Sequence, residues 1–520
     1  MIPSLTQLLH NPDCYPHPVS LPIQVIETQV SWVLLTGEFA YKFKKEIYFG
    51  FLDFSTLAKR QFYCEEELRL NQRLAPDIYQ AVVAIQSGDE HPIICTDDHR
   101  LDQTPEPVPA TGQTLEYAVR MLQFDHTAGL DQLMQKNQFE EHWIDELAEQ
   151  LALFHQKLPT VASNSPWGTA SNIWQLVSDN YIHTLDFCQD SQDLEQLAEL
   201  YGQATEQYSA LLDVFQERRN QGFIRECHGD LHLGNVTLYA KRLRLFDCIE
   251  FNLQFRWIDT CADLAFLLMD LEACGKYAWA NRALNRYLEI TGDYQCLLLL
   301  DFYKCFRSMV RAKVATLGSQ ADQSIFQKYL HLSQSYQIRK APKLILMHGL
   351  SGSGKSYLSA KLLEHSHLIR IRSRTQRRRL YIELQKKGKN LELYGPEINA
   401  RLSQHLLNLA EQLISQGYTV VVDGTFLKQH FRQKYINLAK KLNTPMKIIS
   451  CYCEHKLMEA RLIKSKDTRF NDKQQLLQRL YDQQLSEQPL SEAEVLLQHK
   501  VYTASDLAIQ EFISQFEVVS

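Results

Sequence analysis

The 520-residue chain is 45% hydrophobic and 22% charged, which is enough apolar sequence for ordinary cores and predicts two to four folded domains. It has no apolar run near the roughly 18 to 20 residues that cross a bilayer, and residues 1–19 lack the basic start and long apolar stretch of a signal peptide. Nothing in the sequence therefore argues for membrane insertion or export, and we expect a cytoplasmic protein without a membrane partner.

In the first part of the chain, β-branched and aromatic residues recur at short spacing in segments that we predict to be strands, at 29–35, 40–44 and 79–85. Helical periodicity predicts a helix at 57–74 and mostly helical sequence from residue 140 onward, for example at 144–155. A short β-like segment at 236–247 interrupts the helical part. This order predicts an α+β fold with a small β-rich lobe and a larger helical lobe.

The strand at 40–44 carries a candidate phosphate-binding lysine. Ala40 and Lys42 reproduce the AxK of a kinase strand, in which the lysine is directed toward the α- and β-phosphates. The following helix offers Glu67 as the acid that pairs with this lysine, with Glu66 as the neighbouring alternative. Lys44 lies on the same strand face and competes with Lys42 for the role. An exposed lysine beside an unrelated acidic helix is the remaining interpretation.

Further along, residues 228–235 read HGDLHLGN and are followed by LRLFD at 243–247. In a kinase catalytic loop, four residues separate the aspartate of HxD from an asparagine, and a magnesium-binding aspartate follows after a short hairpin. Asp230, Asn235 and Asp247 have this spacing. We predict that Asp230 orients the attacking hydroxyl and accepts its proton, and that Asn235 and Asp247 bind Mg²⁺ beside the γ-phosphate of ATP.

These residues resemble the aminoglycoside phosphotransferase and choline kinase branch of the kinase fold, whose loop is typically HGDLHxGN. The resemblance extends over about residues 29–271 and implies ATP as donor and a small hydroxyl compound as acceptor. It includes Asp259 and Asp263, which we expect to act as structural braces that cap a helix. The glycine-rich phosphate loop is weak, because residues 30–45 contain only Gly37.

A polar stretch at 333–342 separates two parts of opposite charge. From Lys343 onward, 27 basic and 17 acidic residues give a balance of +10, whereas the preceding residues give −16. We therefore predict a first domain at 1–332, a linker at 333–342 and a second domain at 343–520. The basic second domain is the one expected to meet a polyanion.

In the second domain, strands alternate with helices, which predicts an α/β P-loop domain with a parallel sheet. The predicted strands lie at 344–347, 368–372, 419–422 and 447–453, and the helices lie at 356–363 and 401–416. The second helix ends at Gly417, a residue suited to a left-handed cap.

The first of these strands leads into HGLSGSGKS at 348–356, which fits GxxxxGKS without a mismatch and opens a helix. Its glycines let successive backbone N–H groups turn inward around phosphates, Lys355 reaches the β- and γ-phosphates, and Ser356 ligates Mg²⁺. The predicted nucleotide-binding residues are Gly349, Leu350, Ser351, Gly352, Ser353, Gly354, Lys355 and Ser356.

Two further features of this domain bear on its chemistry. Asp423 follows the strand at 419–422, where it is predicted to hold magnesium as a Walker B acid, or else to cap the next turn. An arginine run at 370–379 is a candidate for holding a phosphorylated or polyanionic substrate, and the alternative is a solvated helix face. Its members are Arg370, Arg372, Arg374, Arg377, Arg378 and Arg379.

This half resembles the small P-loop kinases that phosphorylate metabolites or polynucleotide ends. The layout of the whole chain is similar to bifunctional aminoglycoside phosphotransferase and ATP-binding proteins. The resemblance implies nucleotide binding by residues 349–356 and Asp423, and a place for Arg461 in a lid. Two positions depart from the pattern, since Arg374 replaces a frequent aspartate and Ser465 replaces a second lid arginine. Both departures bear on acceptor choice and turnover.

The twelve cysteines are scattered, and only Cys451 and Cys453 lie close together. Their CxC spacing differs from the CxxC of common zinc and redox sites, so we expect reduced thiols that pack in cores.

The sequence thus predicts a bifunctional ATP-dependent phosphotransferase that uses ATP and Mg²⁺ at two sites and acts on a small-molecule hydroxyl or phosphate acceptor. The basic C-terminal half also fits a nucleic-acid end kinase or repair factor, which ranks lower. A third hypothesis is a nucleotide sensor whose second site does not transfer phosphate. The acceptors, the coupling of the sites and the oligomeric state are not specified.

Overall fold

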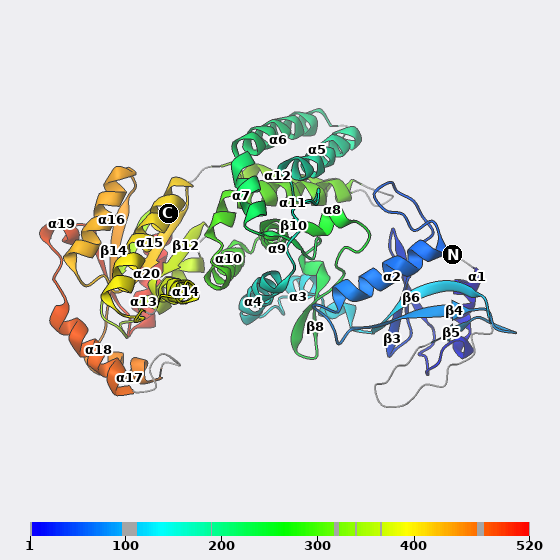
Figure 1. The fold of residues 1–520 in the computed structure, drawn as a ribbon, viewed down its shortest axis with the longest axis horizontal. Helices are drawn as coiled ribbons and strands as arrows, with labels where there is room; N and C mark the ends of the chain where they lie inside the picture. Colours follow the sequence, from blue (N-terminus) through cyan, green and yellow to red (C-terminus); the bar gives the residue numbers. More distant parts are fainter. Residues whose placement is uncertain are drawn as a thin grey trace. The chain divides into compact units, whose positions relative to one another are not determined.

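The computed structural model describes residues 3–95, 112–188, 190–316, 322–338, 341–364, 367–389, 391–464 and 473–518. The chain forms two compact units (Figure 1). The first comprises Met1–Asp270 and Phe302–Leu330, and the second comprises Leu271–Asp301 and His331–Ser520. The units differ from the predicted division at 333–342 in one segment, because Leu271–Asp301 groups with the C-terminal residues.

The first unit begins with an antiparallel sheet and two helices. These elements are α1 (Pro3–His10), β1 (Gln24–Glu27), β2 (Ser31–Leu35), β3 (Phe39–Lys44), α2 (Leu57–Asn71), β4 (Tyr79–Gln86), β5 (Ile93–Cys95) and β6 (Thr114–Leu122). The strand order is β1-β2-β3-β6-β4-β5. Alternation along β3 places Tyr41 and Phe43 in the cluster that contains α1, whereas Ala40 packs with α2 on the opposite face. Lys42 and Lys44 share the face of Ala40.

The rest of the first unit is mostly helical. Its helices are α3 (Leu130–Gln135), α4 (His142–Lys157), α5 (Ala170–Phe187), α6 (Ser191–Ala210), α7 (Leu212–Asn220), α8 (Leu253–Arg256), α9 (Thr260–Ala273), α11 (Leu300–Ala315) and α12 (Gln323–Ser335). Strand β7 (Ile224–Glu226) pairs with β10 (Trp257–Asp259), and β8 (Val236–Tyr239) forms a hairpin with β9 (Arg242–Leu245). Ala240 and Lys241 turn the hairpin with φ of 47° and 62°, as a tight two-residue turn requires.

The predicted strands and helices of the first unit are confirmed, and the β-like segment at 236–247 is the β8–β9 hairpin. The sequence did not predict β1, β5 and β6. The structure shows an antiparallel sheet followed by a helical part, and the assignment of this unit to the kinase fold stays a prediction.

The second unit contains a five-stranded sheet in the order β12-β13-β11-β14-β15. Its parallel pairing agrees with the prediction for this part of the chain, whereas the fifth strand, β15, and the strand order were not predicted. Its elements are α10 (Tyr277–Thr291), β11 (Leu344–His348), α13 (Lys355–Lys361), β12 (Leu368–Arg372), α14 (Ser373–Lys386), α15 (Pro396–Ser415), β13 (Thr419–Asp423), α16 (Gln429–Lys441), β14 (Met446–Tyr452), α17 (His455–Lys464), α18 (Lys473–Ser486), α19 (Glu492–Val495), β15 (Gln498–Tyr502) and α20 (Asp506–Val518). Residues of α13 and α20 join Ile345, Met347 and Ile449 in one core cluster. Gly417 has a φ of 91° after α15, as its predicted cap role requires.

Two statements hold for the described ranges of both units. None of their helices is long and apolar enough to cross a membrane. All twelve cysteines are free thiols, and most of them are buried, as the sequence predicted.

Helix α10 is fastened to the edge strand β12 by asparagine side chains. Asn285 donates to the Leu368 backbone oxygen and accepts from the Arg370 backbone nitrogen, both at 2.8 Å. This side-chain amide therefore forms the hydrogen bonds with the β12 backbone that a neighbouring strand would otherwise form. Asn281 donates to the Leu363 oxygen, also at 2.8 Å.

One turn further along α10, Glu289 holds two arginines of β12. Its carboxylate lies 2.6 Å from Arg370 Nη2 and 3.1 Å from Arg372 Nη1. The second unit is therefore incomplete without a helix that precedes residue 302.

We expect Glu289→Gln to destabilise the second unit, because Arg370 is 8% exposed and would lose the carboxylate that neutralises it. Removing one partner of a buried ion pair lowers the free energy of unfolding by about 3–5 kcal/mol. Urea denaturation followed by circular dichroism measures the change. The matched control is Glu397→Gln, because the exposed pair of Glu397 with Arg401 contributes about 0.3–0.5 kcal/mol. Equal shifts in the two variants would contradict the expectation.

Candidate nucleotide and phosphotransfer sites

In the first unit, two lysines and three carboxylates form one network between β3 and α2. Glu67 lies 2.8 Å from the Nζ atoms of both Lys42 and Lys44. Lys42 Nζ also lies 2.5 Å from Asp247 Oδ1, and Lys44 Nζ pairs with Glu250. Glu67 thus joins two lysines that each reach a second acid.

The two lysines differ in what they reach. The Lys44 side chain is only 2% exposed and is enclosed with Glu250, whereas Lys42 contacts Asp247, whose side chain is 43% exposed. Burial acts to lower the pKa of Lys42, but Asp247 and Glu67 outweigh it and raise the pKa well above its usual value. Lys42 is therefore a charged amine that faces the open side of the network.

Glu66, the alternative acid on α2, is engaged elsewhere. It pairs with Arg69 at 2.8 Å and with Arg256 at 2.7 Å. Arg69 and Arg256 also contact Glu226 at 2.8 and 3.2 Å, which ties α2 to the β7–β10 pair. Glu67 is therefore the acid that contacts Lys42.

The loop before the β8–β9 hairpin brings together Asp230, Asn235 and Asp247. Asn235 Nδ2 donates to the Asp230 backbone oxygen at 2.9 Å and to Asp230 Oδ2 at 3.1 Å. The hairpin then returns the chain, and the Phe246 nitrogen donates to the Asn235 oxygen at 3.0 Å. Asp247 follows with a φ of 64°, a left-handed conformation that costs a residue with a Cβ about 1–2 kcal/mol. Such strained residues cluster at functional sites.

Asp230 is held in its ionised form. His232 Nε2 lies 3.5 Å from its carboxylate. Burial acts to raise the pKa of Asp230, but the hydrogen bond and charge of His232, together with His228 and Arg307, lower it to about 2. A carboxylate with this pKa is a weak base at neutral pH, so it is suited to orienting a hydroxyl group more than to early proton removal.

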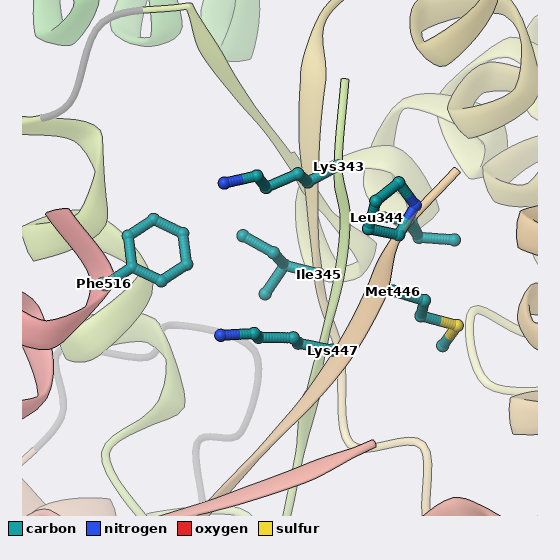
Figure 2. Close-up of a pocket in the computed structure, with 7 residues that line it drawn as sticks. Lys343, Leu344, Ile345, Met446, Lys447 and Phe516 are labelled. Atoms are coloured by element: carbon teal, nitrogen blue, oxygen red, sulfur yellow. The ribbon is translucent and has the colours of Figure 1, made fainter. Parts of the chain in front are cut away.

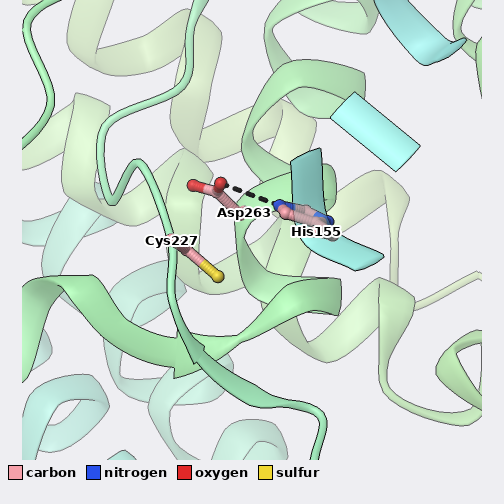
Figure 3. A group of neighbouring side chains, drawn as sticks. All are labelled: His155, Cys227 and Asp263. Atoms are coloured by element: carbon pink, nitrogen blue, oxygen red, sulfur yellow. Dashed lines mark hydrogen bonds and ion pairs between the residues drawn. The ribbon is translucent and has the colours of Figure 1, made fainter. Parts of the chain in front are cut away.

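Asp263 braces this loop from α9 (Figure 3). Its carboxylate accepts from the backbone nitrogens of His228 at 3.1 Å and Gly229 at 2.9 Å, and it bonds His155 Nε2 at 3.1 Å. His155, Cys227 and Asp263 thereby offer three ligand atoms within 4.8 Å of one another. Since the Cys227 thiol also donates to a backbone oxygen, all three groups are already bonded within the protein. The bracing role predicted for Asp263 is confirmed, although it acts on the loop rather than as a helix cap.

Asp259 is the residue that caps α9, as predicted. Its Oδ1 accepts from the Cys261 backbone nitrogen at 2.8 Å. The same carboxylate receives two hydrogen bonds from the buried Arg218, both at 2.8 Å.

The β2–β3 connection is a two-residue turn. Thr36 donates to the Phe39 oxygen at 2.9 Å, which leaves Gly37 and the next residue to reverse the chain. Gly37 has a φ of 106°, and a Cβ there would lie 2.4 Å from Ser20 Oγ. Turn geometry and close packing therefore account for this glycine without a phosphate contact.

In the second unit, the P-loop glycines are required by both conformation and space. Gly349, Gly352 and Gly354 have φ of 129°, 82° and 86°. A Cβ at these positions would lie 2.4, 2.6 and 2.7 Å, respectively, from atoms of Cys451, Met458 and Thr503. A loop built from such residues can turn its backbone N–H groups toward one anion, so it fits the phosphates of a nucleotide.

The predicted lysine and magnesium ligands lie at the same edge of the sheet. Lys355 is 7% exposed, and its Nζ donates to the Leu350 oxygen of its own loop at 2.5 Å. Burial lowers the pKa of Lys355, against the opposing effect of Asp423. Ser359 Oγ lies 3.2 Å from both the Ser356 backbone oxygen and Asp423 Oδ2, so it connects the start of α13 to the Asp423 carboxylate. The sequence did not identify Ser359, because it lies outside the motif.

The arginine run is only partly a solvated surface. Besides the contacts of Arg370 and Arg372 with Glu289, Arg372 Nε lies 3.8 Å from Asp423. Arg379 donates to the Glu289 backbone oxygen at 3.1 Å. The sequence missed Glu289, because no local pattern connects α10 with β12.

Arg461, predicted to belong to a lid, contacts the P-loop. It donates to the Gly352 oxygen at 3.4 Å and to the Thr503 oxygen at 2.7 Å. It therefore braces the loop from α17. Ser465 lies outside the described residues.

A cavity lies at the opposite edge of the parallel sheet, where β11 and β14 begin (Figure 2). It is lined by Lys343, Leu344, Ile345, Pro445, Met446, Lys447 and Phe516. Figure 2 shows the side chains of Lys343, Ile345 and Lys447 directed to the side of Phe516. The P-loop follows the other end of β11, so this cavity is separate from the predicted nucleotide site.

Residues 344–489 match the family model described as an AAA domain. The match covers the P-loop and four of the five parallel strands. The match and the geometry together assign a P-loop, kinase-like fold to the C-terminal part of the chain. They do not reach the first unit, and its resemblance to aminoglycoside phosphotransferases stays a prediction.

Uncharacterized proteins of Mycobacterium tuberculosis and Mycobacterium bovis are similar to the chain as a whole. Each is 26% identical over 466 residues, which cover 86% of this chain and 88% of the relative. An alignment of this length includes residues of both units.

Three of the similar solved structures are kinases, and their similarity to this chain is low. A sugar kinase from Janibacter is 15% identical over 34% of this chain and 95% of its own, with a TM-score of 0.26. A gluconokinase from Sinorhizobium meliloti is 18% identical over 35% and 99%, with a TM-score of 0.25. A Plasmodium vivax ethanolamine kinase is 10% identical over 61% and 82%, with a TM-score of 0.33. These TM-scores are too low to carry a conclusion about function.

We expect Gly352→Ala to weaken ATP binding by more than about tenfold, because the new Cβ would displace the P-loop against Met458. Isothermal titration calorimetry measures the change. Gly388→Ala is the matched control, since Gly388 has a similar φ of 76° but no atom within 4 Å of an added Cβ. Comparable losses of affinity in both variants would contradict this expectation. They would show that backbone strain, and not the clash of the new Cβ at the P-loop, weakens ATP binding.

The free energy of unfolding of the first unit should fall as the pH drops from about 4 to about 2. The pKa values of Asp230 and Asp263 are both lowered from 3.8 to about 2 in the folded state. In this window the unfolded chain binds more protons than the folded chain, so acid favours unfolding. Thermal denaturation across the window measures the slope. Asp263→Asn should flatten it, and an unchanged slope in this variant would contradict the assignment.

Proposed function

We propose that this chain is an ATP-dependent phosphotransferase with two nucleotide sites, one in each unit, and that both act on small-molecule acceptors. The observation that carries the proposal is the P-loop, where three glycines have positive φ and no room for a Cβ beside the buried amine of Lys355. The network of Lys42, Glu67 and Asp247 supports the second nucleotide site.

In the C-terminal unit, residues 349–356 would hold the phosphates, with backbone N–H groups and Lys355 as donors. The Ser356 hydroxyl and the Asp423 carboxylate are the oxygen ligands suited to Mg²⁺, and Ser359 holds the carboxylate through a hydrogen bond to Oδ2. When bound, Mg²⁺ supplies positive charge to the phosphate oxygens during transfer. The ammonium group of Lys355 would supply further positive charge at the γ-phosphate.

In the N-terminal unit, Lys42 would bind the α- and β-phosphates while Glu67 fixes its position. Asn235 and Asp247 offer oxygen ligands for Mg²⁺, because Asn235 Nδ2 is used on Asp230 and its Oδ1 is the remaining polar atom. Asp230 would orient the acceptor hydroxyl. The acceptor oxygen bonds to the γ-phosphorus as the bond to the β–γ bridging oxygen breaks, ADP leaves, and the hydroxyl proton passes through Asp230 to solvent.

The alternatives are a nucleic-acid end kinase and a nucleotide sensor. The pairing of Arg370 and Arg372 with Glu289 favours a small acceptor over a polyanion, because it neutralises part of the basic run. The contact of Arg372 with Asp423 places an arginine beside the predicted magnesium ligand. This is the observation that favours a nucleotide sensor, without phosphate transfer, in this unit.

We expect Asp230→Asn and Lys355→Ala each to abolish one of two transfer activities, with losses of about 10²–10³-fold in kcat. Transfer of labelled γ-phosphate to a panel of hydroxyl metabolites measures both, and the double variant should retain neither activity. Lys361→Ala is the control, since Lys361 lies on the P-loop helix and pairs with Glu364 at an exposed position. A double variant that transfers phosphate at the parental rate would refute the proposal.

A further inference from the structure

Beyond Arg370 and Arg372, the basic run contains an arginine with neutral partners. Arg377 Nη1 donates to Asn399 Oδ1 at 2.6 Å and to the Leu393 oxygen at 3.2 Å. Among the described residues, no carboxylate forms an ion pair with it. Its charge is therefore not neutralised in the way that Glu289 neutralises the charges on β12.

A second arginine, Arg479 of α18, meets Arg377 at Tyr394. The guanidinium groups of Arg377 and Arg479 lie 5.0 and 4.5 Å from the Tyr394 ring centroid. Arg479 likewise has no carboxylate partner within the described part of the chain. Burial lowers the pKa of Arg377. Tyr394 opposes this shift, and the positive charge of Arg479 adds to it. Two like charges are thus held together without an anion between them.

The helices that carry this pair, α14 and α18, both lead to the edge of the sheet where the P-loop lies. Helix α14 begins directly after Arg372, which is in register with Asp423 across the β12–β13 pair. Helix α18 contacts the loop itself, because Gln483 Oε1 accepts from the Ser351 backbone nitrogen at 2.9 Å. Arg479 precedes Gln483 by one turn and so lies on the same helix face, about 6 Å away along the axis.

We propose that Arg377 and Arg479 bind a carboxylate or phosphate group on the acceptor of the C-terminal unit, so that this acceptor is a small hydroxyl compound bearing an oxyanion. Planar guanidinium groups bind such groups through paired N–H donors, and Tyr394 holds both in place. The inference rests on the proposed phosphotransfer at the P-loop and adds the class of its acceptor.

The test uses the full-length protein carrying Asp230→Asn, so that Lys355-dependent transfer is the activity measured. A filtered small-molecule extract is separated by anion exchange into retained and unretained fractions. Each fraction, and separately an oligonucleotide with a 5′-hydroxyl end, is incubated with γ-labelled ATP. We expect Lys355-dependent product from the retained fraction alone.

Arg377→Gln and Arg479→Gln should each reduce the rate at limiting acceptor by about tenfold or more, with a smaller effect at saturating acceptor. Calorimetry should show unchanged ATP binding in both variants, which excludes loss of folding. Arg377→Lys should recover part of the rate, because it restores the charge but not the planar fork. Arg401→Gln, at an exposed arginine of α15, should behave like the parent.

Product from the unretained fraction or from the oligonucleotide would overturn the inference and leave phosphotransfer in place. The same holds for retained-fraction product that neither glutamine variant affects. If no fraction gives a Lys355-dependent product, the proposed function of this unit fails, and the inference fails with it.

Discussion

Each unit depends on one buried carboxylate that holds two basic side chains. In the first unit, Glu67 lies between Lys42 and Lys44, and in the second, Glu289 holds the two arginines of β12. A cation buried without a partner is strongly unfavourable, so these acids decide whether the basic groups can be placed inside at all. In both units the carboxylate comes from a helix packed against a strand that carries the cations.

In each pair, one cation also lies near an aspartate. Lys42 lies 2.5 Å from Asp247, and Arg372 lies 3.8 Å from Asp423. These are the aspartates that the sequence marks as magnesium ligands. The position of each predicted metal ligand is thereby connected, through a basic side chain, to a helix outside the motif that contains the ligand. Changes in α2 or α10 are therefore expected to alter the predicted phosphate sites.

The sequence predicted what depends on local spacing. The P-loop, the loop with Asp230 and Asn235, and the parallel sheet of the second unit follow from motif and periodicity, whereas the strand order of that sheet does not. It favoured Lys42 and kept Lys44 as a competing assignment, because both lie on one strand face. In the structure both lysines contact Glu67. The sequence also did not predict which side chains outside the motifs contact them in space. These residues include Glu289, Ser359 and Gln483.

Strand β6 shows a different reason for failure. It lies between β3 and β4, yet its apolar pattern is broken by Glu116, which is 1% exposed. That acid is buried because Arg60 of α2 donates to both of its oxygens, at 3.0 and 2.9 Å. A buried ion pair of this kind reads as surface in sequence. The edge strand β1 is mostly exposed and has only four residues, which is too short to show a clear alternation.

Neither compact unit is a single continuous segment of the chain, since residues 271–301 belong to the second unit and residues 302–330 belong to the first. A single proteolytic cut near residue 331 would consequently not release two independent bodies. The N-terminal fragment would keep α10, whose Asn281, Asn285 and Glu289 bind the C-terminal fragment without a peptide bond between them. The nicked protein should therefore migrate as one particle until it is denatured.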